Sequence, residues 1–548
     1  MKKFFQKNKT IIVLGLIVII AAFFRFWCLT QNPLGFSADE ATIGYNAYSI
    51  LKTGADEYGV RFPLAFKAFS DYQAPLYTYL TVPSIAVLGL NEFAVRLPSA
   101  VFGILTVITV YFLCLEIFKN STIGLSAAFL LAISPFHVFF SRGAWQANLA
   151  TFLITLGFYL FAIGLRSGKY LPLSVLAFLA SLYSYQSPRL VVPIMGFFLV
   201  LLYWKVLWKK KKALFTSFVL GLIFFIPILF ILTGTAGQAR FKGVSIFSDS
   251  GPVNQINSLR GEHSNPNGII ALIFHNKVQT FSVIMAENYF KHFSPDFLFF
   301  KGDPIGRQNV PGMGVLYLFD IILLPAGLAL MLKKEWFSKS KMVFIWLIFA
   351  PLASAFTFQT PNALRAANMS VPLAIVSGFG AYSFFEFISS KRLLIKLFSF
   401  LLVFAVGLFF VLRFLNLYFV HLPQKYGLEW EYGFNEMVNY IGQNKEKYQK
   451  IIITNRYDQP YILTLFYLKY DPKTYQSIGK QETLIDKFGF TTISSFDNFE
   501  FRHIDWANDS KLKNVIIVGT AEEIPDKVPT AKEIRFPNGK VAFKIVER

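Results

Sequence analysis

The chain has 548 residues, of which 54% are hydrophobic, 18% aromatic and 16% charged, and its formal net charge is +21. A soluble protein of this size needs a larger charged fraction to cover its surface, so the composition excludes a soluble globular enzyme. The basic excess lies mainly in short loops between apolar runs, which fits anionic lipid headgroups and membrane topology, and we expect no nucleic-acid partner. Cys28 and Cys114 lie in or at the end of apolar runs and offer neither a disulfide framework nor a metal-thiolate motif.

The first apolar run, 11–28, follows a basic start, as the core of a signal peptide would. Arg25, Phe26 and Trp27 stand where a small-residue cleavage site would be. We therefore predict a retained signal anchor whose N-terminus is cytoplasmic.

Long apolar runs of about the length that crosses a bilayer continue along the chain. The eleven spans predicted in total are 11–28, 97–117, 122–140, 148–165, 171–185, 190–207, 213–233, 312–332, 342–357, 368–388 and 394–418. The run 75–90 is also apolar enough to cross. If it crossed, every later loop would change sides and the basic cluster 209–212 would face outside, so we predict a juxtamembrane or re-entrant helix there.

The loops between these spans alternate in charge. One set carries nearly all the short-loop Lys and Arg residues, including the cluster 209–212, and is cytoplasmic by the positive-inside rule. The other set contains two large outer loops, 29–96 and 234–311. Within the second, 268–300 is apolar and aromatic, which predicts helices that lie on the membrane surface.

The composition changes after the last span, which divides the chain into a membrane domain, 1–420, and a small extracytoplasmic α/β domain, 421–548. KIIITN at 450–455 and NVIIVGT at 514–520 predict buried strands, and 536–546 predicts a hairpin around an Asn-Gly turn. The segment 431–447 has helical spacing. The fold class is therefore a polytopic α-helical membrane protein with a small C-terminal α/β domain.

Two adjacent carboxylates, Asp39 and Glu40, follow the first span by only a few residues. A carboxylate just outside the membrane suits a general base. The alternative is an exposed acidic loop or a helix start, since Ser37 or Asp39 is a good N-cap for a helix that runs through Tyr48.

Arg142, Arg189 and Arg365 each lie at a span end in a short outer loop with few other charges. A guanidinium matches phosphate oxygens with two parallel hydrogen bonds, so we predict that the three contribute to one anion site. The alternative for each is contact with lipid headgroups or capping of main-chain carbonyls.

The second large loop ends in a polar cluster just before the eighth span. Its members are His292, Asp296, Lys301, Asp303, Arg307 and Gln308. His292 and Asp296 are four residues apart, which places them on one helix face, but one His and one Asp are weak evidence for a metal. We assign no metal ligand and no certain cofactor, and a divalent metal stays a weakly supported alternative.

Several segments, in this order, resemble the GT-C superfamily of polyprenyl-phosphate-sugar-dependent glycosyltransferases, and in particular its bacterial protein mannosyltransferase and lipid A aminoarabinose transferase branch. They are the Asp39-Glu40 loop, DYQAPLY (71–77), VRLPSAVFGILTV (95–107), SPFHVFFSRGAWQANL (134–149), YSYQSPRLVVP (183–193) and PNALRAANMSVPL (361–373). The resemblance covers roughly residues 10 to 430. It implies inverting transfer of a sugar from a lipid-linked monophosphate donor on the outer face, with Asp39 as base and Glu40 beside it.

The chain departs from that family at three glutamines. Gln73 begins Gln-Ala-Pro-Leu where the family usually reads His-Lys-Pro-Pro-Leu or Lys-Ala-Pro-Leu, so a basic residue that would contact the lipid phosphate is missing. Gln146 and Gln186 stand where relatives often have Glu and His, which weakens a metal site. The resemblance therefore shifts phosphate binding to Arg142, Arg189, Arg365 and Arg307, with the three glutamines, His292 and Gln308 as further site candidates.

The predicted function is a membrane glycosyltransferase that moves a sugar from a polyprenyl-phosphate donor to a hydroxyl of a lipid, glycan or protein acceptor. The main alternative is a polytopic transporter or lipid flippase. Such proteins tend to place paired ionisable groups at the bilayer midplane, often in repeated halves. A membrane anchor for the C-terminal domain, an oligosaccharyltransferase and a polysaccharide ligase are further alternatives.

Overall fold

The computed structural model describes residues 2–548 except 70, 235–236, 238–242, 480–481 and 486–490. The chain divides into two compact units. Unit 1 comprises Met1–Phe24, Phe102–Phe140 and Ala147–Leu412, and unit 2 comprises Arg25–Val101, Ser141–Gln146 and Arg413–Arg548. The predicted fold class is confirmed, whereas the predicted domain boundary at residue 420 stays a prediction. Unit 2 joins the first outer loop to the C-terminal domain, which the sequence did not indicate.

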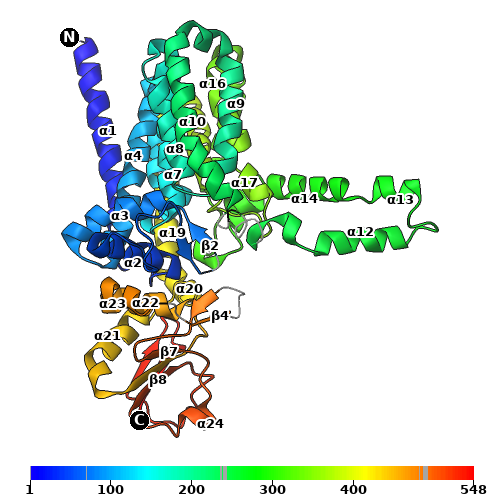
Figure 1. The fold of residues 1–548 in the computed structure, drawn as a ribbon. Helices are drawn as coiled ribbons and strands as arrows, with labels where there is room; N and C mark the ends of the chain where they lie inside the picture. Colours follow the sequence, from blue (N-terminus) through cyan, green and yellow to red (C-terminus); the bar gives the residue numbers. More distant parts are fainter. Residues whose placement is uncertain (1, 70, 235–236, 238–242, 480–481, 486–490) are drawn as a thin grey trace. The chain divides into compact units, whose positions relative to one another are not determined.

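Unit 1 is a helical bundle (Figure 1). Its helices are α5 Ser121–Ile133, α6 Pro135–Arg142, α7 Gln146–Ser167, α8 Leu171–Leu182, α9 Pro188–Leu207, α10 Lys211–Thr233, α12 Gly251–Gly261, α13 Ile269–Phe274, α14 Lys277–Lys291, α15 Asp320–Met331, α16 Lys334–Phe349, α17 Leu352–Ala355, α18 Ser370–Ser389 and α19 Leu393–Asn416. The helices α1 Lys2–Phe26 and α4 Glu92–Phe118 contribute residues to both units, and the ends of α6, α7 and α19 likewise extend into unit 2. Among the described residues, nine helices are long and apolar enough to cross a membrane, or ten if α5 and α6, bent by 55°, form one span.

Three predicted segments differ in helix length from what the sequence indicated. The predicted spans 171–185 and 312–332 contain only α8 and α15, each of 12 residues and therefore about 18 Å long, against a hydrocarbon core of roughly 30 Å. Turns around Gly312, with φ of +77°, delay the second of these helices until Asp320. Ile269–Phe300 also has the length and composition of a candidate span, and the surface helices predicted for 268–300 stay a prediction.

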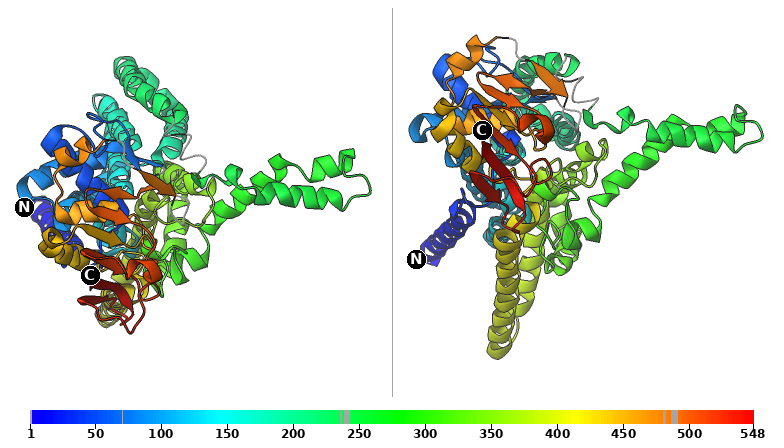
Figure 2. Two further views of the ribbon diagram at one scale, coloured as in Figure 1. Left: turned by 60° about the horizontal axis from the view of Figure 1, so that its bottom comes forward. Right: turned by 90° about the horizontal axis from the view of Figure 1, so that it is seen from below.

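Helices α12, α13 and α14 form an extension that stands out sideways from the other helices of unit 1 in all three ribbon views (Figures 1 and 2). Many of its apolar side chains are exposed; Ile269 is 75% and Val278 is 78% accessible. In a membrane protein such an apolar, uncovered surface fits lipid better than water.

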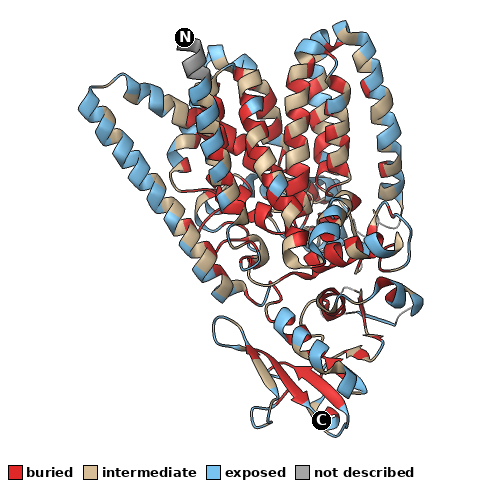
Figure 3. Ribbon diagram, turned by 90° about the vertical axis from the view of Figure 1, so that its left-hand side faces the viewer, coloured by how far each residue is buried: buried red, intermediate tan, exposed pale blue. Residues whose placement is uncertain are grey.

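Helices α5, α15 and α18 pack closely because glycines line their contacts. A Cβ on Gly327 would lie 1.9 Å from the carbonyl oxygen of Val376, and one on Gly378 would lie 2.8 Å from the nitrogen of Ala127. Figure 3 shows the buried residues gathered on the inner helices of the bundle.

Unit 2 combines the segment after α1 with a mixed β-sheet. Its further helices are α2 Ala38–Thr53, α3 Pro75–Leu88, α20 Leu422–Tyr426, α21 Phe434–Asn444, α22 Pro460–Leu468, α23 Pro472–Ser477 and α24 Trp506–Asp509. Its strands are β1 Phe66–Ala68, β2 Asp71–Gln73, β3 Lys450–Ile453, β4 Thr483–Ile485, β5 Thr491–Ile493, β6 Ser495–Phe496, β7 Phe499–Phe501, β8 Val515–Gly519, β9 Lys532–Arg535 and β10 Val541–Glu547.

The six-stranded sheet has the order β6-β7-β3-β8-β10-β9. Strand β3 is parallel to β7 and β8, whereas β10 is antiparallel to β8 and β9. The two predicted buried strands and the predicted hairpin, which turns at Gly539 with φ of +83°, are therefore present. One face of the sheet packs a buried aliphatic cluster that includes Ile452, Ile517 and Val546.

Helix α2, which is part of the first outer loop, packs against Val95 at the end of that loop and against the C-terminal domain. Gly44 has no side chain where a Cβ would lie 2.6 Å from the Phe466 ring and 2.7 Å from Val95, so only glycine allows this approach. The Gln476 amide also donates to the Ser49 and Thr53 hydroxyls, at 2.9 and 3.0 Å. The C-terminal domain thus fixes the helix on which the acidic pair lies.

Candidate functional site

Asp39 lies in the first turn of α2. Ser37 is the N-cap and, with Glu40, forms a capping box, so the helix start named as an alternative in the sequence is present. The Asp39 side chain is only partly buried, and its Oδ1 accepts a hydrogen bond of 3.3 Å from Gln73 Nε2. The N-terminal turn also carries the positive end of the helix dipole. Asp39 is therefore an accessible carboxylate with a neighbouring amide donor.

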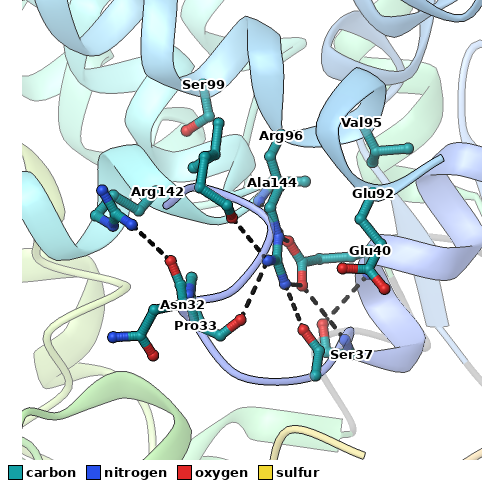
Figure 4. Close-up of polar contacts among 12 residues, drawn as sticks. Asn32, Pro33, Ser37, Glu40, Glu92, Val95, Arg96, Ser99, Arg142 and Ala144 are labelled. Carbon is teal, nitrogen blue, oxygen red and sulfur yellow. Dashed lines mark hydrogen bonds and ion pairs between the residues drawn. The ribbon is translucent and has the colours of Figure 1, made fainter. Parts of the chain in front are cut away.

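Glu40, the next residue, is buried, and both of its carboxylate oxygens accept hydrogen bonds. Its two oxygens accept from Arg96 Nε at 2.9 Å and Arg96 Nη2 at 3.0 Å, the geometry of a bidentate ion pair. The main-chain N–H groups of Ser37 and Ala144 donate to the same carboxylate at 3.3 and 2.8 Å. Figure 4 shows these contacts converging on Glu40. Glu40 thus serves as a structural anchor beside Asp39.

Arg96 was not among the site residues predicted from the sequence. Besides Glu40, its Nη1 donates to the carbonyls of Leu29 and Pro33 at 3.1 and 3.2 Å, and its Nη2 donates to the carbonyl of Gly35 at 2.6 Å. All five guanidinium N–H donors are used, in a fully buried position. The available signal was an arginine near the start of an apolar run, because a buried charge requires a partner.

Arg142 holds the main chain instead of facing an open site. Its Nη2 donates to the carbonyls of Trp27, Cys28 and Asn32 at 2.8, 3.1 and 2.8 Å. Its Nε donates to the Tyr418 hydroxyl at 3.3 Å, and the side chain is almost completely buried. This geometry favours carbonyl capping, the alternative stated above, over contact with a lipid phosphate.

Gln146 is linked to the strand that carries Gln73. Its Nε2 donates to the carbonyl of Ala74 at 2.8 Å. The Oε1 atom of Gln73 is buried and accepts no hydrogen bond within the part of the chain that the structure describes. The structure therefore gathers Asp39, Gln73 and Gln146 around the end of β2.

Arg189 and Gln186 form a local pair at the start of α9. Arg189 Nη1 donates to Gln186 Oε1 at 2.5 Å, and its Nε donates to the carbonyl of Leu182 at 3.0 Å. Both side chains are partly exposed, so the pair keeps a guanidinium at the end of the α8–α9 connection. That Arg189 shares one anion site with the other predicted arginines stays a prediction.

His292, at the end of α14, is buried with both ring nitrogens in use. Nδ1 lies 2.8 Å from the carbonyl of Asn288, and Nε2 lies 2.9 Å from Ser354 Oγ and 3.1 Å from the Asn362 N–H. A carbonyl partner requires a proton on Nδ1, so Nε2 accepts. His292 therefore joins α14 to the loop before Arg365. Asp296, four residues on, pairs with Lys301 at 2.7 Å.

Asp303 joins the same loop to the segment that carries Arg307 and Gln308. Its two oxygens accept from the N–H groups of Ile305 and Ala363. Burial raises the pKa of Asp303 to about 7, and these N–H groups and the positive Arg365 act in the opposite direction. Arg307 and Gln308 are partly buried; among the described residues, Gln308 Oε1 has no donor.

The Arg365 side chain is partly exposed, and one nitrogen of its guanidinium is held by hydrogen bonds. Its Nη1 donates to Thr357 Oγ1 at 2.7 Å and to the carbonyl of Phe358 at 2.9 Å. Its N–H is capped by the Asn362 side chain at 2.8 Å. This arrangement orients a guanidinium next to the Asp303 loop. The described residues contain no group of three or more His, Cys, Asp or Glu side chains arranged for a metal ion.

Comparison with known proteins finds one matching family model and solved structures of two proteins with a similar fold. Residues 72–231 match the family model described as dolichyl-phosphate-mannose-protein mannosyltransferase. No curated protein matches the chain in sequence. The fold is similar to ArnT from Cupriavidus metallidurans in the apo state, with 10% identity, 98% of each chain covered and a TM-score of 0.55. For the same protein bound to undecaprenyl phosphate, the identity is 11%, 98% of each chain is covered and the TM-score is 0.53.

The second similar structure is the oligosaccharyltransferase AglB from Archaeoglobus fulgidus, in complex with an inhibitory peptide and a dolichol-phosphate. Identity is 14%, the TM-score is 0.53, and the match covers 85% of this chain and 64% of AglB. The chain thus spans just under two thirds of that relative. At such identities the likeness establishes a shared fold.

The buried ion pair gives a stability prediction. Arg96→Met leaves the Glu40 carboxylate buried without its cation, so we expect it to lower the free energy of unfolding by about 3–5 kcal/mol, measured by denaturant titration followed by tryptophan fluorescence in detergent. The double variant Glu40→Met/Arg96→Met is the matched control and should regain most of this loss, because it leaves no uncompensated charge. An equally unstable double variant would contradict this account.

Proposed function

We propose that this chain, which belongs to the GT-C superfamily of membrane glycosyltransferases, transfers a sugar from a polyprenyl-phosphate-linked donor to an acceptor hydroxyl. The observation that carries the proposal is the different state of two adjacent carboxylates: Glu40 is buried in an ion pair, whereas Asp39 is partly exposed beside Gln73. An accessible carboxylate on a rigidly held helix turn is what a general base needs.

In the proposed reaction, the acceptor hydroxyl attacks the anomeric carbon of the donor sugar and Asp39 takes its proton. The bond between the anomeric carbon and the phosphate oxygen breaks, and polyprenyl phosphate leaves with inversion. Glu40 is a positioning residue, because it acts through the capping box and through Arg96. Gln73 orients the Asp39 carboxylate, and Gln146 supports the strand that carries Gln73.

The leaving phosphate gains negative charge, which cations stabilise strongly where water is scarce. Arg365 is the main candidate, since Thr357 and Phe358 already orient its guanidinium. Arg307 and Arg189 are secondary candidates, with Gln308 and Gln186 beside them. Arg142 is a positioning residue in this proposal. The ligands named for the two similar proteins, undecaprenyl phosphate and a dolichol-phosphate, support a lipid phosphate as the common donor group.

The proposed site favours an enzyme over a transporter or flippase. Asp39 and Gln73 lie outside the candidate spans, which are Asn8–Phe26 and Glu92–Phe118 on either side of them. A transporter would be expected to place its paired ionisable groups within spans.

We further propose that the N-terminus is cytoplasmic and that the C-terminal domain faces outward, as the charge alternation indicates. In a chain with Cys28→Ser and Cys114→Ser, a membrane-impermeant maleimide should label Ser477→Cys on intact cells. Lys212→Cys should be labelled only after lysis. Both positions are exposed on the protein, so labelling reports sidedness. The reverse pattern would overturn the proposed orientation.

The base is tested by Asp39→Asn. We expect this variant to keep its fold and to lower kcat by roughly 10²–10⁴-fold, the usual contribution of a general base. The assay follows transfer from a panel of radiolabelled prenyl-phosphate sugars. Asp71→Asn, on β2, is the matched control and should transfer at the parental rate. If Asp39→Asn also keeps the parental rate, Asp39 is not the base.

The phosphate contact is tested by Arg365→Ala. Loss of hydrogen bonds to a charged group costs about 1.5–3 kcal/mol, so the KM for the donor should rise roughly tenfold to a hundredfold. Arg260→Ala serves as control, because Arg260 likewise donates to a carbonyl, that of His275. Donor KM equal to the parental value in Arg365→Ala would remove this residue from the phosphate site.

A further inference from the structure

Unit 2 contains a cleft of about 910 Å³ that the proposed reaction does not use. One wall comes from the first outer loop, around Gly35 and Glu92. The other wall comes from the C-terminal domain, chiefly α21 and the end of α22. The volume is typical of a ligand site, which ranges from about 300 to 1,000 Å³.

Helix α21 presents a row of amides to this cleft. Asn435, Asn439 and Gln443 line it at intervals of four residues, so they lie on one helix face, and all three are exposed. Asn439 Nδ2 donates to Asn435 Oδ1, which fixes the order of the first two amides. Each amide offers both donors and an acceptor, as does each hydroxyl of a sugar.

Across from this row, Glu92 supplies a fixed carboxylate. Its Oε1 accepts from the Tyr467 hydroxyl at 2.7 Å and from Asn435 Nδ2 at 3.3 Å. Aromatic rings also line the cleft, including Tyr432 and Tyr440. Flat apolar rings match the C–H faces of pyranose rings, while amides and carboxylates match their hydroxyl edges.

The charges in the cleft do not suit a phosphate. Of the described residues that line it, the cations are Lys469 and Lys532, and none is an arginine. Lys532 is paired with Glu436 at 2.8 Å, and two further glutamates, Glu92 and Glu431, line the cleft. The excess of carboxylates favours a neutral ligand over an anionic one.

We propose that this cleft binds a neutral glycan that is part of the acceptor; the link to an acceptor rests on the proposed function. Arg96 contacts both the wall of the cleft and the helix turn that carries the candidate base. The Gly35 carbonyl, in the cleft wall, accepts from Arg96 Nη2, and Arg96 holds Glu40 next to Asp39. Asp39 does not line the cleft, so the glycan bound there is a portion of the acceptor away from the reacting hydroxyl.

The binding test uses saturation-transfer difference NMR on the full chain in lipid nanodiscs, with mannotriose, maltotriose and chitotriose as probes. At least one trisaccharide should receive saturation, and neither inorganic phosphate nor a short acidic peptide should displace it. Asn439→Trp and Gln443→Trp fill the cleft and should each abolish the signal. Glu446→Trp, exposed just beyond α21 and outside the cleft, is the matched control and should retain it.

Three results would overturn the proposal: no saturation of any trisaccharide, displacement by phosphate or peptide, or a full signal in both cleft variants. The transfer assay separates this proposal from the proposed function. Asp39→Asn should lose transfer and keep the trisaccharide signal, whereas Asn439→Trp should raise the KM for the acceptor without changing the KM for the donor. If the parental protein transfers sugar but binds no trisaccharide, only the proposed glycan site in the cleft is contradicted. Trisaccharide binding by a protein that transfers no lipid-linked sugar contradicts the proposed function alone.

Discussion

The buried ion pair between Glu40 and Arg96 is the interaction on which the rest of unit 2 depends. Together the two side chains of the pair bond to four segments: the loop at 29–35, helix α2, helix α4 and the turn at Ala144. A buried pair adds little net stability over apolar packing, but either partner alone is costly. Its main consequence is therefore geometric, because each of the four segments must lie where the pair requires.

That constraint separates the roles of two adjacent carboxylates. Because successive residues of a helix point about 100° apart, Glu40 faces Arg96 while Asp39 lies on another face, next to Gln73. The C-terminal domain reinforces the arrangement, since the Phe466 ring packs where Gly44 has no side chain and Gln476 holds the far end of α2. A domain without a catalytic motif of its own thus helps to position the proposed base.

Several features could be predicted because they depend on local chemistry. Ser37 and Glu40 are spaced as a capping box, and the helix begins there. The apolar strands at 450–455 and 514–520 form where the pattern predicts them. The partners of buried charges could not be predicted in this way. Arg96 lies 56 residues from Glu40, and Arg142 donates to the carbonyl of Asn32, 110 residues away.

The sequence by itself determined the membrane fold class and the scarcity of charge in the short loops that hold Arg142, Arg189 and Arg365, and it offered a helix start at the acidic pair as one alternative. These features follow from composition, periodicity and capping, which act over a few residues. Only the tertiary structure decided which carboxylate pairs with Arg96, which carbonyls Arg142 contacts and that the first outer loop and the C-terminal domain share a cleft. Such pairings join residues up to hundreds of positions apart, and hydrogen-bond geometry and burial select them only once the chain has folded.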